Sequence, residues 1–230
     1  MDYVIQLHVV EVAIRSSGLG QVCAFGFGLA TLHDDELLRS FGQYLIVFSL
    51  FHFSEYATTA LCNPRFLSID SFLLNHSIQY WLAAFSCWLE FFTELRLFPG
   101  LKMLKLISLF GLILCIVGET IRKLAMVQAG SNFSHLIAFK KEPSHRLITS
   151  GIYSIVRHPS YVGWFLWCVG TQVLLVNPIC TVIFAVVSWR FFNERIFLEE
   201  QTLVAFFGME YVNYQKKVRC GLPWIEGFKI

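Results

Sequence analysis

The sequence predicts an all-α integral membrane protein with about six transmembrane helices, and three observations predict it. Of the 230 residues, 56% are hydrophobic and only 15% are charged, whereas a soluble domain usually carries about 25% charged residues. No Asp, Glu, Lys or Arg occurs between Arg157 and Arg190, a run of 32 residues. Similar runs of 19 and 18 residues cover 71–89 and 16–33. Because a bilayer-spanning helix needs about 20 mainly apolar residues, these blocks indicate a polytopic membrane protein.

The spans can be placed in order along the chain. The first four precede residue 127 and form an N-terminal region over 16–126. The fifth and sixth are separated only by Asn177-Pro178, a turn-forming dipeptide, so we expect a tight helical hairpin there. Residues 1–14 are amphipathic and are expected to lie along the membrane surface. The six predicted spans cover residues 16–33, 41–62, 72–92, 104–126, 159–176 and 178–192.

The distribution of Lys and Arg predicts which side of the membrane each connection faces. Fourteen of the 18 basic residues fall on the side that holds both termini and the two long polar segments, 127–158 and 193–230. The other four fall on the opposite side. Because cytosolic loops are enriched in Lys and Arg, we expect both termini and both polar segments to face the cytosol.

Composition and motifs exclude several classes of function. The net charge is +2 and no basic stripe interleaves with aromatic residues, so the sequence predicts no nucleic-acid binding. The seven cysteines are scattered and form no CxxC pair, and there is no HExxH motif, so no metal site is predicted. There is also no GxSxG nucleophile motif and no phosphate-binding loop of the GxxxxGK[ST] type.

The first stretch that could carry chemistry covers 145–163 and leads into the fifth span. Pro159 falls at the expected first turn of that helix, and the amides that follow it could hold a carboxylate or another anion. His158, Tyr153 and Tyr161 add hydrogen-bonding groups and flat apolar faces. This combination suits a ligand with an aromatic base, a sugar and an amino-acid end. The same residue types also gather at membrane interfaces for solvation alone, and local content does not decide between these interpretations.

The second such stretch continues the sixth span as a helix. Arg195 and Glu199 are four residues apart and therefore share one helix face. An arginine at the bilayer edge can bind a carboxylate through two parallel hydrogen bonds, and an acidic residue one turn away can hold it or bind a ligand hydroxyl or amine. The alternative is an ordinary surface ion pair, worth a few tenths of a kcal/mol.

Five ionisable residues fall within or beside the predicted spans. Charges at bilayer depth are costly, so each needs a partner or a function. Glu119 and Arg122 are three residues apart and could pair with each other near the cytosolic end of their helix. We interpret all five as structural anchors: Glu55, Glu90, Glu94, Glu119 and Arg122.

Motifs along about 200 residues carry a family resemblance. The C-terminal motifs are Gly151-x-Tyr153, Arg157-His158-Pro159-Ser160-Tyr161-x-Gly163-Trp164, Gly170-Thr171-Gln172, Asn177-Pro178, Arg195-x-x-x-Glu199-Glu200, Phe207-Gly208-x-x-Tyr211-x-x-Tyr214 and Leu222-Pro223. Segments 50–56, 70–76 and 129–133 add upstream motifs. Together they resemble the isoprenylcysteine carboxyl methyltransferases of eukaryotic membranes. Phospholipid methyltransferases and sterol reductases share a looser form of the C-terminal motifs, and the upstream motifs separate the chain from them.

The resemblance implies an enzyme of the endoplasmic reticulum membrane, with its active site facing the cytosol. Such an enzyme transfers the methyl group of S-adenosylmethionine to the C-terminal carboxylate of a farnesylated or geranylgeranylated cysteine in a processed CaaX protein. Small GTPases are the substrate proteins that we expect. The chain would form a single membrane-embedded domain over 1–230, in which 127–230 is the catalytic region.

The resemblance also implies residue roles. The position matching Arg195 is assigned to the substrate carboxylate, and Glu199 contacts the cofactor, so these two are the predicted catalytic residues. The predicted cofactor-binding residues are His145, Arg146, Leu147, Ile148, Tyr153, His158, Pro159, Ser160, Tyr161 and Glu199.

Two other classes of protein remain as alternatives. One is a membrane-embedded reductase of the sterol type, which would use NADPH and perform no methyl transfer. The other is a small transporter that uses Glu55, Glu90 and Glu119 as an ion path. The sequence contains no inverted repeat and no matching pair of broken helices, which disfavours the transporter.

Overall fold

The structure is a computed structural model that describes residues 2–31, 36–74 and 78–230. All regular elements in these ranges are helical, and one isolated bridge joins Val156 and Arg219. This confirms the all-α prediction. The elements are α1 (Asp2–Thr31), α2 (Glu36–Cys62), η1 (Pro64–Phe66), η2 (Ile69–Phe72), α3 (Ile78–Leu97), α4 (Pro99–Lys102), α5 (Lys105–Ala129), η3 (Gly130–Asn132), η4 (Gly151–Ser154), α6 (Pro159–Leu174), α7 (Pro178–Phe207) and α8 (Met209–Lys217).

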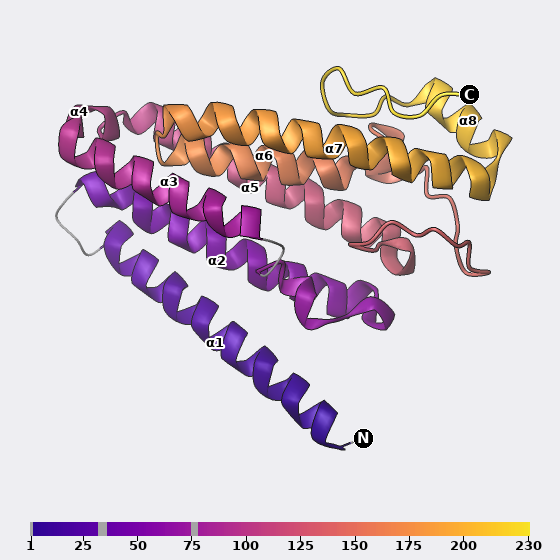
Figure 1. Cartoon of the computed structure of the whole chain (residues 1–230), viewed down its shortest axis with the longest axis horizontal. Coiled ribbons are helices and arrows are strands. Elements are labelled where there is room, and N and C mark those ends of the chain that lie inside the picture. The colour runs from indigo at the N-terminus through magenta and orange to yellow at the C-terminus, as the bar shows by residue number, and fades with distance from the viewer. Residues whose placement is uncertain (1, 32–35, 75–77) are drawn as a thin grey trace.

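The long helices alternate in direction along one axis of the molecule (Figure 1). Both chain ends and the segment between α5 and α6 lie at one end, and α4 lies at the other with the turn between α6 and α7. This arrangement places the two long polar segments on the same side, as the charge distribution predicts. By length and composition, one helix of the described ranges could cross a membrane, over Leu37–Cys62. The count of six spans therefore stays a prediction.

Three element boundaries differ from the predicted spans. Helix α1 runs without a break from Asp2 to Thr31, so residues 2–14 continue the first predicted span instead of forming a separate surface helix. The third helix begins at Ile78, because Leu73 has a left-handed backbone (φ 55°) that ends η2 just after the buried Phe72. Helix α7 extends past the sixth span to Phe207, which confirms the prediction that this span continues as a helix. Residues 32–33 and 75–77 of the predicted spans lie outside the described ranges.

Helices α5 and α6 pack in backbone contact because glycines face each other between them. A Cβ atom at Gly118 would lie 2.6 Å from the Gly163 carbonyl oxygen, and one at Gly111 would lie 2.1 Å from the Leu174 nitrogen. Gly170 is equally close to α5, with Leu114 Cβ 2.9 Å away. Small residues at such positions let membrane helices approach closely and gain dispersion contacts.

Buried polar contacts hold the α6–α7 turn at the far end of the molecule. Lys102 Nζ donates to Glu94 Oε2 at 2.7 Å and to the carbonyl oxygens of Leu175 and Val176 at 3.0 and 2.9 Å. A cation at these carbonyls, just past the end of α6, also complements the helix dipole. Glu90 accepts from the first amides of α7 at 2.7 Å. Glu90 and Glu94 are therefore structural anchors, as expected.

The glycine contact gives a prediction about stability. We expect Gly118→Val to destabilise the fold by about 1–3 kcal/mol or more, the usual cost of overpacking, because the added side chain meets the α6 backbone. Thermal unfolding of the purified protein in lipid nanodiscs, followed by tryptophan fluorescence, measures it. Gly28→Val is the control, since a Cβ there has nothing within 4 Å. Equal melting temperatures for both variants would contradict the prediction.

Candidate active site

A cavity of about 620 Å³ lies among α2, α3, α6, α7 and the segment that follows η3. Polar side chains line one end of it, and the rest is largely aromatic and aliphatic. On α7 the lining extends from Cys180 to Arg195, 15 residues or about 22 Å of helix. The polar lining includes Arg122, His135, Ser160, Tyr161 and Arg195, and the apolar lining includes Phe48, Leu82, Trp164, Trp167, Ile183, Phe184, Val187 and Phe191.

One side of the cavity is open between α3 and α7. Leu82 of α3 and Val187 of α7 line the cavity, yet they are 60% and 62% exposed. Ile183 and Phe191 are likewise lining residues that remain about half exposed. A long apolar chain can therefore reach the cavity from the side, and its polar end can reach the end of the cavity that holds Arg195.

Arg195 is held by contacts from two other segments. Its Nε donates to the Tyr161 hydroxyl at 2.9 Å, and its Nη2 donates to the His135 carbonyl oxygen at 2.5 Å. The guanidinium carbon also lies 5.6 Å from the centre of the Tyr161 ring. Within the described residues, Nη1 makes no hydrogen bond, so one edge of the guanidinium can bind a ligand.

Tyr161 connects the two predicted catalytic residues. Its hydroxyl donates to Glu199 Oε2 at 2.5 Å and accepts from Arg195, so Arg195 and Glu199 are bridged rather than paired directly. The alternative interpretation, an ordinary surface ion pair between Arg195 and Glu199, is therefore wrong, because the Tyr161 hydroxyl lies between the two side chains. The Tyr161 amide is also not free to bind an anion, since it donates to the His158 carbonyl oxygen at 3.1 Å.

The other predicted cofactor residues gather around the same stretch of α7. The His145 ring lies 6.1 Å from the Phe206 ring. The Tyr153 hydroxyl donates to the Ala125 carbonyl oxygen at 3.2 Å, and burial, then the nearby Glu199 carboxylate, raises the pKa of Tyr153. Three more predicted cofactor residues lie between His145 and Tyr153 in sequence. Arg146 is exposed, and Leu147 and Ile148 are half-buried.

Glu200, a motif residue to which the sequence analysis assigned no role, holds the C-terminal part of the chain in place. This carboxylate is fully buried and accepts from Arg157 Nε at 2.9 Å and from His158 Nε2 at 3.0 Å. It also accepts from Tyr211 and Gln215 of α8 at 3.0 and 2.9 Å. Burial alone would raise the pKa of Glu200, but the His158 contact and the Arg157 charge lower it. His158 is thus engaged with a structural carboxylate.

Glu55 is a second buried carboxylate that the sequence treated only as an anchor. It accepts from Arg122 Nε and Nη2 at 2.6 and 2.7 Å and from His135 Nε2 at 2.9 Å. Lys123 pairs with it as well. The expected pairing of Arg122 with Glu119 is therefore wrong, because α2 brings Glu55 to the guanidinium. Two sequence signals pointed to Glu55: the cost of a charge at bilayer depth and its place in the family motif over 50–56.

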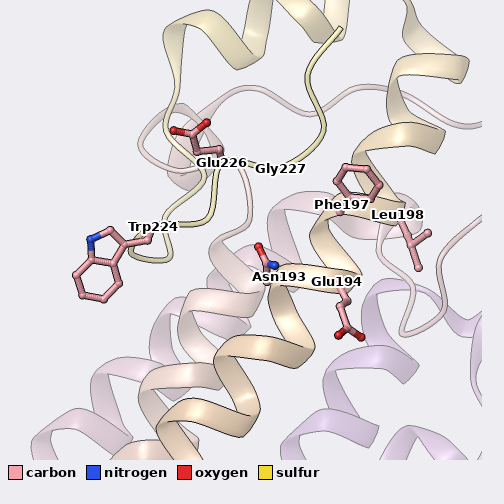
Figure 2. Close-up of a pocket in the computed structure, with 7 residues that line it drawn as sticks. All are labelled: Asn193, Glu194, Phe197, Leu198, Trp224, Glu226 and Gly227. Carbon is pink, nitrogen blue, oxygen red and sulfur yellow. The ribbon is translucent and has the colours of Figure 1, made fainter.

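A second, shallow pocket of about 530 Å³ lies where the C-terminal segment crosses α7 (Figure 2). Asn193 and Glu194 lie on the helix, and Trp224 and Glu226 extend from the C-terminal segment away from it. Trp224 is 90% exposed. Since its polar groups do not converge on one point, this pocket has no arrangement suited to catalysis.

Comparison with known proteins agrees with this arrangement. The model of the isoprenylcysteine carboxyl methyltransferase family matches residues 111–205, which contain both predicted catalytic residues. A protein-S-isoprenylcysteine O-methyltransferase from Xenopus laevis is 54% identical over 96% of this chain and 76% of its own length. The enzyme of the same name from Homo sapiens is 50% identical over 96% and 77%.

A solved structure of the eukaryotic intramembrane Ras methyltransferase, isoprenylcysteine carboxyl methyltransferase, superposes with a TM-score of 0.93. It is 46% identical and covers 95% of this chain and 78% of that one. These matches favour a methyltransferase over the reductase and transporter alternatives. At this identity and coverage, the chain belongs to the isoprenylcysteine carboxyl methyltransferase family.

Proposed function

We propose that this enzyme transfers the methyl group of S-adenosylmethionine to the C-terminal carboxylate of a prenylated cysteine, forming a methyl ester. One observation carries the proposal: a long apolar cavity, open on one side, has a single arginine available at its polar end. A prenylated cysteine has the matching shape, since a long hydrocarbon chain ends beside a carboxylate.

The apolar part of the cavity suits the prenyl chain. Aromatic and aliphatic side chains line it, among them Trp164, Phe184 and Val187. Each CH₂ group that leaves water for such a lining gains about 0.8 kcal/mol, although a chain that arrives from lipid gains less. The cavity would therefore select the substrate by shape and would hold its carboxylate beside Arg195.

The reaction needs alignment more than acid–base chemistry. The substrate carboxylate is ionised near neutral pH, because an α-carboxyl has a pKa of about 3.5, so no general base is required. The free edge of Arg195 would hold one carboxylate oxygen in place and leave the other to attack. Tyr161 and His135 fix the guanidinium, and the aromatic lining excludes bulk water. Such positioning can contribute roughly 7–11 kcal/mol in favourable cases.

The residues around Glu199 fit the methyl donor by their chemistry. The Glu199 carboxylate suits a ribose hydroxyl or an ammonium group, and the exposed Arg146 suits a carboxylate. Tyr153 and the half-buried Leu147 offer apolar surface for an adenine ring. When bound, S-adenosylmethionine would supply a methyl group on a positively charged sulfur; the acceptor carboxylate would take up this methyl group, and S-adenosylhomocysteine would leave.

The position of the polar end supports a cytosolic site in the endoplasmic reticulum membrane. Arg195 donates a hydrogen bond to the His135 carbonyl oxygen, in the 127–158 segment. This segment lies at the same end of the molecule as both termini (Figure 1), and these parts of the chain carry most of the basic residues. A water-soluble methyl donor would enter from the cytosol, and the prenyl chain would enter from the bilayer. Processed CaaX proteins, small GTPases among them, are the substrates that meet both conditions.

Methyl transfer itself is the first experiment. The purified protein in lipid is mixed with methyl-labelled S-adenosylmethionine and N-acetyl-S-farnesylcysteine, and base-labile methyl ester is counted. We expect labelled ester that depends on both substrates. Binding of the methyl donor without ester formation would mean that the acceptor is wrong, and the absence of donor binding would overturn the proposal.

The role of Arg195 gives a mutational prediction. Arg195→Ala should abolish turnover while it leaves S-adenosylmethionine binding largely intact, because it removes the group that orients the carboxylate. Ester formation and equilibrium binding of the labelled donor measure the two effects. Arg190→Ala, at an exposed position earlier on α7, is the matched control and should keep its activity. Unchanged turnover in Arg195→Ala would remove this arginine from the mechanism.

The role of the cavity gives a second prediction. Ile183 lines the cavity 12 residues, or about 18 Å, from Arg195 along α7. Ile183→Trp should therefore raise the KM for a geranylgeranyl acceptor more than the KM for a shorter geranyl acceptor. Kinetics with acceptors of two, three and four isoprene units test this. Ile179→Trp, one turn away and exposed, should leave the order of the acceptors unchanged.

A further inference from the structure

We infer that Glu55 is a positioning residue for the reaction and that it fixes the substrate arginine, Arg195, through His135. The inference rests on the proposed function and names a residue that lies outside the predicted catalytic and cofactor-binding set. Glu55 is on α2, Arg195 is on α7, and His135 lies in the segment after η3. Two consecutive hydrogen bonds connect them.

The connection from Glu55 to Arg195 passes through a single residue, His135. The His135 side chain donates from Nε2 to Glu55 Oε2 at 2.9 Å, and the His135 carbonyl oxygen accepts from Arg195 Nη2 at 2.5 Å. The ring contact therefore determines where the carbonyl oxygen lies, and the carbonyl oxygen holds one edge of the guanidinium. Since His135 and Arg195 both line the cavity, a shift of one displaces the other at the point where the carboxylate would bind.

The residues just before His135 are attached to the end of α2 without Glu55. Asn63 Nδ2 donates to the carbonyl oxygens of Ser131 and Phe133 at 3.1 and 2.7 Å. These two bonds keep the segment on the end of α2. The contact between Glu55 and His135 is thus not required to keep these residues on α2. Its effect falls on His135 itself, whose carbonyl oxygen accepts from Arg195.

Glu55 has a second connection that reaches the start of α6. Arg122 binds Glu55 through two nitrogens and donates from Nη1 to Ser160 Oγ at 2.8 Å. Ser160 belongs to the segment predicted to bind the methyl donor. One carboxylate therefore supports both the arginine for the acceptor and the helix start for the donor. Loss of Glu55 should disturb both substrates, whereas loss of the His135 side chain should disturb the acceptor alone.

The test compares steady-state kinetics for both substrates in four proteins: wild type, Glu55→Gln, His135→Ala and His135→Gln. We expect His135→Ala to raise the KM for N-acetyl-S-farnesylcysteine and to lower kcat/KM roughly 10- to 100-fold, because a misplacement of about 1 Å can cost on the order of 100-fold. Its KM for S-adenosylmethionine should stay at the wild-type value, and its melting temperature should fall only modestly, because Glu55 keeps Arg122 and Lys123 as partners. His135→Gln keeps an N–H donor for Glu55 and should recover most of the loss.

Glu55→Gln should raise the KM for both substrates. The double variant Glu55→Gln/His135→Ala should have the same acceptor KM as Glu55→Gln, since both changes break one connection. His8→Ala on α1 is the control for removal of a histidine. If Glu55→Gln does not fold, the two His135 variants still decide the question.

Three outcomes would overturn the inference. The first is wild-type kinetics in His135→Ala, and the second is a loss of stability in that variant with no change in either KM, which would indicate a structural role. The third is an inactive wild-type protein, in which case the proposed function fails and the inference fails with it. Activity in the wild type together with unchanged kinetics in both His135 variants overturns the inference alone.

Discussion

The backbone contact between α5 and α6 is the constraint on which the rest of the structure depends. Because Gly118 and Gly163 leave no side chain between the two helices, their axes approach closely enough for polar groups on both helices to bond directly. That approach places Arg122 of α5 beside Ser160 of α6. It also fixes the wall of the cavity, since the next turns of α6 carry lining residues such as Trp164. A bulkier residue at the crossing would push α5 and α6 apart and would disturb the polar end of the cavity.

Two buried carboxylates, Glu55 and Glu200, then organise the polar end. Glu55 draws α2, α5 and the segment after η3 together, and Glu200 draws α7, α8 and the segment before α6 together. Each carboxylate is surrounded by cations and N–H or O–H donors, which offsets the cost of removing a charge from water. Arg195 contacts the first cluster through His135 and is linked to the second through Tyr161, whose ring stacks on that of His158, and one edge of its guanidinium is free. Glu55 and Glu200 thus hold the structure, and Arg195 alone is available to the substrate. The site is held rigidly without further free charges, which would bind the substrate carboxylate too tightly.

The proposed methyl transfer requires few catalytic groups, which agrees with a site that has one available arginine. A carboxylate that is already ionised needs no base, and the reaction needs neither a nucleophile from the protein nor a metal. What the fold must provide is a fixed guanidinium, an apolar path for a long chain and the exclusion of water. Arg195, the open side of the cavity at Val187 and the aromatic lining supply these three conditions. The buried Lys102 at the far end contributes by closing the α6–α7 hairpin, on which the cavity is built.

The sequence by itself determined the helical class, the side on which the polar segments lie, and the identity of Arg195, Tyr161 and Glu199 as candidate site residues. The first two follow from local patterns, because apolar runs and charge counts are properties of neighbouring residues, whereas the roles expected of the three candidate residues rest on the family resemblance. The hydrogen-bond and ion-pair partners of these side chains were decided only by the tertiary structure. Glu55 meets Arg122 across 67 positions of sequence, and Tyr161 separates Arg195 from Glu199 although spacing alone predicts that they pair. Such contacts depend on which helices pack together, and that is set by long-range backbone approach at glycines, which no local pattern of charge or hydropathy encodes.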